Sequence, residues 1–160
     1  MHIRMFRDAD LATLKEITVE AFDGASIDQM IEGRFGLLNG GNWRGRKARH
    51  IDADVERDRE GIFVADTDGE VLGYVTTWTD ADAGIGHIPN IAVRAGHRGH
   101  GIGRLLIDHA LGHFRRVGMT HVRIETLENN EVGNHLYTAM GFEEVTRQIH
   151  FIMALDRRKD

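Results

Sequence analysis

Four glycines near the middle of the chain follow a short apolar stretch and precede a segment with helical periodicity. The apolar stretch is Ile91-Ala92-Val93, and the glycines are Gly96, Gly99, Gly101 and Gly103. Glycine allows positive φ and a close approach of the backbone, so this turn can direct several N–H groups toward one point. The first N–H groups of the helix that follows are unpaired and carry a partial positive charge. The spacing therefore predicts a strand, a turn and a helix that bind a phosphate or a diphosphate.

The spacing of these glycines does not match two common phosphate loops. Gly96 and Gly101 have the separation of a Walker loop, but Ile102 stands where that loop needs its lysine. Gly99 and Gly101 begin a Rossmann turn, but Arg104 occupies the position of its third glycine. The loop is therefore predicted to bind a phosphate in some other way.

A second stretch carries a tyrosine that could act as a proton donor. A short helix is expected to begin at Asn130 and to end at Gly141, with Tyr137 seven residues after Asn130. Two helical turns separate these side chains, which places them on one face. A phenol with a pKa near 10 stays protonated at neutral pH and can act as a general acid. The alternative is a tyrosine that only packs in the core.

Both stretches resemble the GCN5-related N-acetyltransferases. Arg98-Gly99-His100-Gly101-Ile102-Gly103 fits the [Arg/Gln]-x-x-Gly-x-[Gly/Ala] pattern of that family's acetyl-CoA loop. Residues 130–142 fit Asn-x-x-Ala-x-x-Leu-Tyr-x-x-x-Gly-Phe, with Gly133 in place of the alanine. The resemblance covers residues 60–155, and it implies an α/β (α+β) fold with a mixed, twisted sheet of about six or seven strands and about four helices.

The resemblance implies a role for each motif. Tyr137 would protonate the departing thiolate of coenzyme A, and Asn130 would lie near the cofactor. The strand at Ile91, Ala92 and Val93 would pair its backbone with the pantetheine arm, and an N–H near Ile91 would stabilise the oxyanion. The remaining expected cofactor contacts lie in the loop: Arg98, Gly99, His100, Gly101, Ile102, Gly103 and Arg104.

The reaction also needs a proton acceptor, because an alkylamine with a pKa near 10.4 is mostly protonated at pH 7. Glu125 resembles the glutamate of Leu-Glu-Val-Arg-x-x-Asn in ribosomal-protein-alanine N-acetyltransferases. The segment here matches at Glu125 and Asn130 but has Leu127 in place of the arginine. His87 and an ordered water are the alternatives to Glu125.

Composition bounds the remaining possibilities. The 160 residues suit one domain, residues 1–160, and the net charge of −5 without a block of like charges predicts no nucleic-acid partner. No apolar run approaches the roughly 20 residues that span a bilayer, and no signal peptide is evident, so we expect no membrane partner and a cytoplasmic location. The chain has no cysteine and one serine, Ser26, so direct transfer is expected rather than a covalent acetyl-enzyme.

The elements that must position these residues follow from hydrophobic periodicity and turn signals. Pro89, which cannot donate to a ladder, should interrupt the central strand. The expected strands are 2–6, 62–65, 71–79, 85–94, 122–124, 142–146 and 149–155; the expected helices begin near residues 8, 26, 102 and 130. Asp68-Gly69 predicts a hairpin turn, and residues 39–49 are expected to form a surface loop.

The predicted function is transfer of the acetyl group of acetyl-CoA to a primary amine, which residues 39–49 and the first two helices would contact. One alternative is a sensor module that binds acyl-CoA without transferring anything, and another is a nucleotide- or metal-binding domain built on the same glycine turn. No metal is expected, although His109 and His113 lie one helical turn apart. A homodimer is possible, and the identity of the amine stays open.

Overall fold

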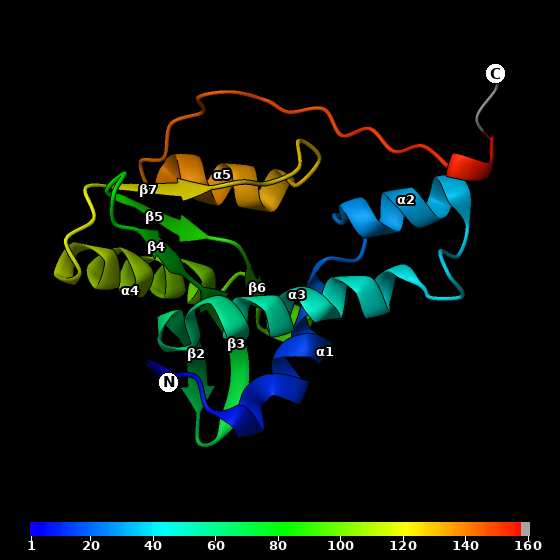
Figure 1. Ribbon diagram of the computed structural model, residues 1–160. Coiled ribbons are helices and arrows are strands. Elements are labelled where there is room, and N and C mark those ends of the chain that lie inside the picture. Colours follow the sequence, from blue (N-terminus) through cyan, green and yellow to red (C-terminus); the bar gives the residue numbers. More distant parts are fainter. Residues whose placement is uncertain (158–160) are drawn as a thin grey trace.

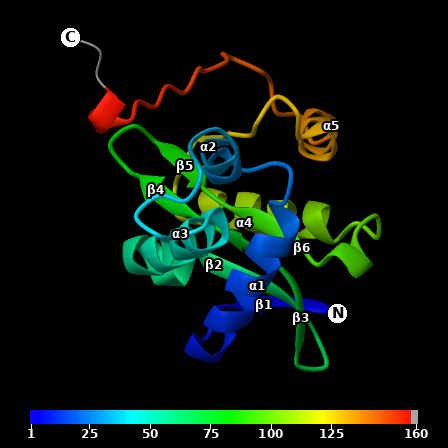
Figure 2. The same cartoon turned by 90° about the vertical axis from the view of Figure 1, so that its right-hand side faces the viewer.

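The computed structural model describes residues 1–157 and arranges the strands of this range in two sheets (Figures 1 and 2). The first sheet has the order β1 (His2–Met5), β2 (Ile62–Thr67), β3 (Glu70–Thr76) and β6 (Ile91–Val93). The second has the order β4 (Trp78–Asp80), β5 (Ile85–Ile88) and β7 (His121–Ile124). All pairs are antiparallel except β5 and β7, which are parallel.

Helices cover both faces of the first sheet. The helices of the described range are α1 (Leu11–Ala21), α2 (Ile27–Phe35), α3 (Trp43–Asp58), α4 (Ile102–Arg116) and α5 (Glu131–Ala139), of which α1, α3 and α4 supply the residues that pack on this sheet. Figure 2 shows α1 and α3 on one side of the first sheet and α4 on the other. The predicted mixed α/β fold is confirmed, and α4 forms the connection between the parallel strands β5 and β7.

Alternation along β2 divides the core into two clusters. Ile62 and Val64 pack with residues of α1 and α3, whereas Phe63 and Ala65 pack with residues of α4. Successive side chains of a strand point to opposite faces, so one apolar strand supplies both clusters. The sheet is therefore the middle of three layers, and its far strand β6 is held at a fixed place between them.

The hairpin between β2 and β3 has the predicted turn. Asp68 and Gly69 have φ angles of 53° and 89°, and the carboxylate of Asp66 accepts the N–H of Gly69 at 2.8 Å. Positive φ at both central residues is what a two-residue hairpin loop with the right strand twist requires. The prediction from the Asp-Gly pair is confirmed.

The central strand predicted over residues 85–94 is divided into β5 and β6. Strand β5 pairs with β4 and β7, and β6 pairs with β3, so the chain leaves one sheet and enters the other at Pro89 and Asn90. Pro89 has no N–H to donate to a ladder, which is why the pairing changes there. The expected break is confirmed.

The prediction of a surface loop over residues 39–49 is wrong, because α3 begins at Trp43. The side chain of Asn42 accepts the N–H of Gly45 as an N-cap, and Trp43, Lys47 and Ile51 are buried. These three residues are four apart and lie on one helical face. Three glycines and a run of basic residues hid this periodicity in the sequence.

The predicted strands over 142–146 and 149–155 are also not formed. After α5 the chain runs extended from Phe142 and ends in a short turn at Leu155–Arg157. A strand needs a neighbouring edge to pair with, and this segment runs past the body of the protein without pairing (Figure 1). The single-domain boundaries 1–160 stay a prediction, since residues 158–160 lie outside the described range.

No helix within residues 1–157 is both long enough and apolar enough to cross a membrane.

A close approach of α4 to β5 gives a test of the packing. A Cβ added at Gly86 would lie 2.3 Å from the ring of Phe114. The variant Gly86→Ala should therefore lower the free energy of unfolding by about 1–3 kcal/mol, as overpacked cores do. Urea denaturation followed by circular dichroism measures this change.

Gly33 in α2 is the matched control, because a Cβ there meets nothing within 4 Å. Gly33→Ala should raise the free energy of unfolding by up to about 1 kcal/mol through helix propensity. Equal effects of the two substitutions would contradict the packing described for α4.

Candidate functional site

The glycine turn has the backbone form that the sequence predicts. Gly99 and Gly101 have φ angles of 78° and 80°, which disfavour any residue with a Cβ. The first backbone bond of α4 runs from the N–H of Leu105 to the carbonyl of Gly101 at 3.1 Å. No side chain caps this helix, so the N–H groups of residues 102–104 remain outside the helical ladder. This end of α4 can donate several hydrogen bonds to an anion.

The two arginines of the turn lie at its margins. Arg98 donates through Nε to the carbonyl of Val93 at 3.1 Å, and Arg104 donates to the carbonyl of Ala139 at 3.4 Å. His100 lies close to the carbonyl of His97. Arg98 thus bonds back to the end of β6 and Arg104 bonds to the end of α5, so both are held near the start of α4.

The edge of the first sheet is open along β6. Ala92 pairs with Tyr74, and the flanking backbone bonds run from Thr76 to Asn90 and from Arg94 to Leu72. Hydrogen-bonded and non-bonded positions alternate in an antiparallel pair, so Ile91 and Val93 point their N–H and C=O groups away from β3. An extended ligand such as a pantetheine arm could pair with these groups as an added strand would.

The two motifs of the sequence lie together in the structure. A Cβ at Gly103, in the first turn of α4, would lie 3.4 Å from Leu136 of α5. The contact from Arg104 to Ala139 joins the same two helices. The start of α4 therefore packs against the helix that carries Tyr137.

Asn130, Gly133 and Tyr137 share one face of α5, as predicted. Asn130 caps the helix by accepting the N–H of Gly133, and it donates to Thr126 at 2.8 Å. A Cβ at Gly133 would lie 2.5 Å from the Asn130 amide and 3.2 Å from the Tyr137 ring. The glycine that departs from the family pattern thus fits the close contact of its two neighbours.

Tyr137 is partly buried beside Phe142. Burial raises the pKa of Tyr137 to about 12. The phenol therefore keeps its proton at neutral pH and can donate it to a stronger base.

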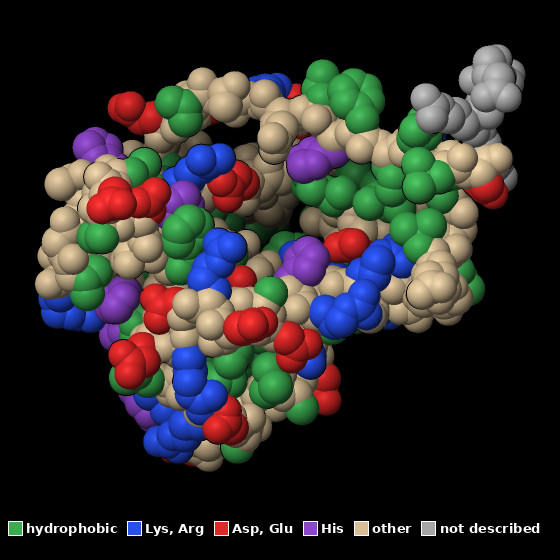
Figure 3. All heavy atoms as spheres, in the orientation of Figure 1, with side chains coloured by type: hydrophobic (Ala, Val, Ile, Leu, Met, Phe, Trp, Pro, Cys, Tyr) green, Lys and Arg blue, Asp and Glu red, His purple; other side chains and the backbone are tan. Residues whose placement is uncertain are grey.

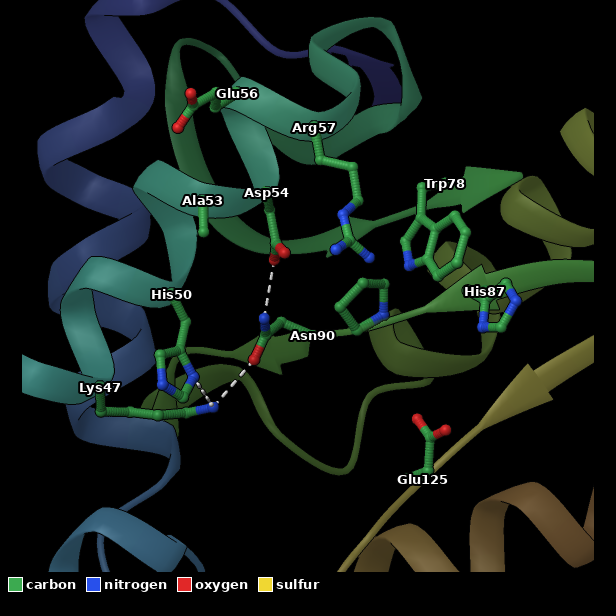
Figure 4. Close-up of a pocket in the computed structure, with 11 residues that line it drawn as sticks. Lys47, His50, Ala53, Asp54, Glu56, Arg57, Trp78, His87, Asn90 and Glu125 are labelled. Atoms are coloured by element: carbon green, nitrogen blue, oxygen red, sulfur yellow. Dashed lines mark hydrogen bonds between the residues drawn. The ribbon is translucent and has the colours of Figure 1, made fainter. Parts of the chain in front are cut away.

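A pocket of about 740 Å³ lies beside the break between the sheets (Figure 4). Side chains of α3 form one wall, β4 and β5 form another, and Glu125 faces them from the end of β7 (Figure 4). The lining residues are Lys47, His50, Ala53, Asp54, Glu56, Arg57, Trp78, His87, Pro89, Asn90 and Glu125.

Both proton acceptors considered from the sequence line this pocket. Glu125 lies one residue beyond β7, is exposed, and forms an ion pair with Arg123 at 2.6 Å. His87 stacks on Trp78 with ring centroids 3.9 Å apart. Burial, with the nearby charge of Arg123, lowers the pKa of His87, so its ring is neutral at pH 7 and able to accept a proton.

The sequence analysis missed the polar cluster at the base of the pocket. Lys47 donates to the amide oxygen of Asn90 at 2.9 Å, and the Asn90 amide donates to Asp54 at 2.7 Å. Asp54 also accepts from the hydroxyl of Thr76 at 2.8 Å. These hydrogen bonds connect α3 to Asn90, where the chain passes from one sheet to the other. The N-cap at Asn42 and the spacing of four between Trp43, Lys47 and Ile51 are the sequence features that could have predicted α3 and its inward face.

Burial controls the charges of this cluster. Burial raises the pKa of Asp54 although the Asn90 and Thr76 hydrogen bonds oppose the change. Burial also lowers the pKa of Lys47 to about 8. Burial thus disfavours the charged form of both the amine and the carboxyl group at the base of the pocket.

The rings of His109 and His113, which lie one helical turn apart, pack on the core rather than toward a common point. Both rings pack edge-on against Phe63, with centroids 4.5 and 5.2 Å away. Within residues 1–157, no three His, Asp or Glu side chains are grouped as metal ligands would be.

The lowered pKa of Lys47 predicts a pH dependence of stability. Between about pH 8 and the ordinary lysine pKa of 10.5, the unfolded chain holds the proton that the folded chain has released. The free energy of unfolding should therefore rise by about 1–2 kcal/mol from pH 8 to pH 10. Denaturation at both pH values should show this rise, and Lys47→Met should remove it.

Lys15 is the control for this measurement, because it is a lysine of α1 at the surface, paired with Asp52. Lys15→Met should keep the same rise. A Lys47→Met protein with the wild-type pH dependence would contradict the assignment.

Comparison with known proteins supports the family suggested by the two motifs. A mycothiol acetyltransferase of Thermomonospora curvata is 29% identical over 153 residues, which cover 88% of this chain and 50% of that protein. The chain spans half or less of the length of the mycothiol acetyltransferases that it matches.

Solved acetyltransferases share the fold. The PaiA N-acetyltransferase of Thermoplasma acidophilum, in complex with coenzyme A, has a TM-score of 0.71 and 20% identity over 89% of both chains. The ribosomal-protein-S18-alanine N-acetyltransferase of Escherichia coli has a TM-score of 0.67 and 18% identity, over 97% of this chain and 85% of that one.

A sequence profile of the acetyltransferase (GNAT) family matches residues 27–142, which is more than half of the chain. The match includes the glycine turn, the pocket beside Asn90 and the helix of Tyr137. The chain belongs to the acetyltransferase (GNAT) family.

Proposed function

We propose that this protein binds acetyl-CoA and transfers its acetyl group directly to a primary amine. The observation that supports this most is that three features lie around the point where the two sheets separate. The uncapped start of α4 offers N–H groups to a diphosphate, the open edge of β6 offers a ladder to pantetheine, and the pocket begins at Asn90.

In the proposed step, the amine nitrogen attacks the thioester carbonyl, so a C–N bond forms and the C–S bond breaks. The outward N–H of Ile91 stabilises the oxyanion of the tetrahedral intermediate. Tyr137 donates its proton to the departing sulfur, and a side chain that lines the pocket accepts the proton from the amine. All atoms of the acetyl group pass to the amine, and coenzyme A leaves as the thiol.

The proton acceptor is proposed to be Glu125, with His87 as the alternative. His87 lies on β5 and Glu125 directly follows the neighbouring strand β7, so both line the pocket, and a water held between them could relay the proton. Asp54 at the base of the pocket joins these candidates because burial raises its pKa and Figure 4 shows its carboxylate directed into the cavity.

The proposed acceptor site is the 740 Å³ pocket. Its walls carry both signs of charge: Arg57 of α3 lies 4.5 Å from the centre of the Trp78 ring, Asp54 lies on the same helix, and Glu125 faces them from the end of β7. Such a pocket suits a polar amine more than an apolar one, because buried charges need partners.

The test of this proposal is release of the CoA thiol from acetyl-CoA in the presence of a panel of amines, with mass spectrometry of the amine product. The panel includes peptide N-termini, lysine, polyamines, aminoglycosides and amino sugars. Acetylated amine and thiol should appear in equal amounts. Binding of acetyl-CoA without any acetylated product across the panel would instead favour the sensor module.

A first prediction concerns the glycine turn. Gly101→Ala places a Cβ on a residue with φ of 80°, which costs about 1–2 kcal/mol in the conformation that binds. The dissociation constant for coenzyme A, measured by calorimetry, should rise about 5- to 30-fold.

Gly96→Ala in the same turn is the control. Gly96 has no positive φ, and a Cβ there meets nothing within 4 Å, so affinity for coenzyme A should change little. If the two variants bind coenzyme A with equal affinity, the conformation of Gly101 is not required for cofactor binding.

A second prediction concerns the proton donor. Tyr137→Phe should lower kcat on the order of 100-fold, the effect of losing a general acid, while the KM for acetyl-CoA changes little. Steady-state kinetics with the best amine of the panel measures both.

Tyr74→Phe removes the hydroxyl of the other tyrosine, which is buried in the core and bonded to Thr18. This control should reduce stability but keep kcat near the wild-type value. If Tyr137→Phe also keeps the wild-type kcat, Tyr137 is not the acid.

A further inference from the structure

One amine of the chain itself lies in the proposed acceptor pocket. The chain has three lysines, Lys15, Lys47 and Lys159, and Lys47 of α3 lines the pocket while only 8% exposed. Its side chain runs beneath His50 and places Nζ between that ring and Asn90 (Figure 4). The space-filling view shows the molecule hollowed above α3, with histidine, basic and acidic side chains around the opening (Figure 3). This amine therefore lies where an external acceptor amine is proposed to bind.

The hydrogen bonds of Lys47 go to neutral groups. Nζ donates to the amide oxygen of Asn90 at 2.9 Å and lies 3.2 Å from Nδ1 of His50. Burial lowers the pKa of Lys47 to about 8, although the carboxylates of Asp28 and Asp54 oppose the change. About 10% of such an amine is neutral at pH 7. The neutral form has the lone pair that can attack a carbonyl.

His50 is placed to accept the proton of this amine. Nε2 of His50 lies 3.4 Å from Oδ2 of Asp28 on α2, so a proton on Nε2 leaves Nδ1 able to accept from Lys47. Burial and the charge of Lys47 lower the pKa of His50, which keeps its ring neutral at pH 7. A nucleophile, a base and a carboxylate that orients the base thus lie next to one another on α3 and α2.

The other partner of Lys47 adjoins the proposed oxyanion site. Asn90 directly precedes Ile91, whose outward N–H is proposed to stabilise the oxyanion. The hydrogen bond to Asn90 therefore holds Nζ one residue away from that donor. Lys15, the other lysine that the structure describes, is paired instead with Asp52 at 2.7 Å on the surface of α1.

We propose that the protein acetylates its own Lys47 when acetyl-CoA is bound and no external amine fills the pocket. The neutral Nζ attacks the thioester carbonyl, so an N–C bond forms and the C–S bond breaks. His50 takes a proton from the attacking amine, Tyr137 donates its proton to the sulfur, and coenzyme A leaves as the thiol. This inference rests on the proposed function, because it uses the same cofactor and the same pocket.

The modification would change the pocket that contains it. Acetylation removes the positive charge of Lys47 and adds an acetyl group at the base of the cavity. Both changes leave less room and a different charge for an external amine. Acetylated Lys47 is therefore expected to slow transfer to that amine, so the protein would switch itself off when acetyl-CoA is plentiful and the acceptor is scarce.

The first experiment incubates the full chain with acetyl-CoA and no amine, and then cleaves it after glutamates. This cleavage places the three lysines in separate peptides, residues 1–16, 33–56 and 145–160. Mass spectrometry should show acetylation of Lys47 at least about 10-fold faster than that of Lys15 or Lys159, because an amine held beside the thioester reacts within one molecule. For the same reason the rate constant at Lys47 should not change with protein concentration.

Variants separate this reaction from chance acetylation. His50→Asn keeps an acceptor near the position of Nδ1 but cannot carry a proton, so the rate at Lys47 should fall on the order of 100-fold while the rate at Lys15 stays the same. His2→Asn is the control, because His2 is exposed on β1 at the far edge of the first sheet from β6, and it should keep the wild-type rate. An excess of an acceptor amine from the panel should slow acetylation of Lys47 by filling the pocket.

The outcomes distinguish this inference from the proposed function. Equal rates at Lys47 and Lys15, or a sample that acetylates an amine of the panel and leaves Lys47 unmodified, would overturn self-acetylation alone. An unchanged rate at Lys47 in His50→Asn would overturn the part given to His50. Absence of acetyl-CoA binding in calorimetry would overturn the proposed function and this inference with it.

Discussion

The change of sheet at Pro89 and Asn90 is the constraint on which the rest of the site depends. Pro89 cannot continue the ladder of β5, and Asn90 bonds through its backbone to Thr76 and through its side chain to Lys47 and Asp54. These bonds fix the start of β6 against β3 while β5 stays with β7. The two sheets therefore separate at one point, and both the open edge of β6 and the pocket begin there.

The same constraint explains why the two sequence motifs meet. Strand β6 runs from the break into the glycine turn, and α4 then returns across the first sheet to deliver β7 beside β5. Because β7 is parallel to β5, its end lies near the break, and Glu125 faces the pocket. Helix α5 follows and packs Leu136 close to Gly103. The uncapped start of α4 and the helix that carries Tyr137 are thus brought together by one crossover.

The features that were predicted correctly from the sequence are those that depend on neighbouring residues alone. The glycine turn, the Asp68-Gly69 hairpin and the shared face of Asn130 and Tyr137 all follow from backbone preferences or helical spacing within a few residues. Each has the expected form in the structure. The roles expected of these residues come from the family resemblance, because local rules do not give them.

What the sequence did not predict depends on contacts between distant segments. Lys47 and Asp54 belong to the site only because α3 packs beside Asn90, 43 and 36 residues further along the chain. The apolar residues at 149–155 predicted a strand, but the structure forms none there, because a strand needs a neighbouring edge to pair with. A sequence pattern names the side chains that need burial and does not say what buries them.

The most direct test of the account is a crystal structure of the protein with coenzyme A. The account predicts that the diphosphate accepts hydrogen bonds from the N–H groups of residues 102–104, that pantetheine pairs with Ile91 and Val93, and that the sulfur lies within reach of the Tyr137 hydroxyl. A cofactor bound away from the start of α4, or a Tyr137 hydroxyl directed into the core away from the sulfur, would contradict it.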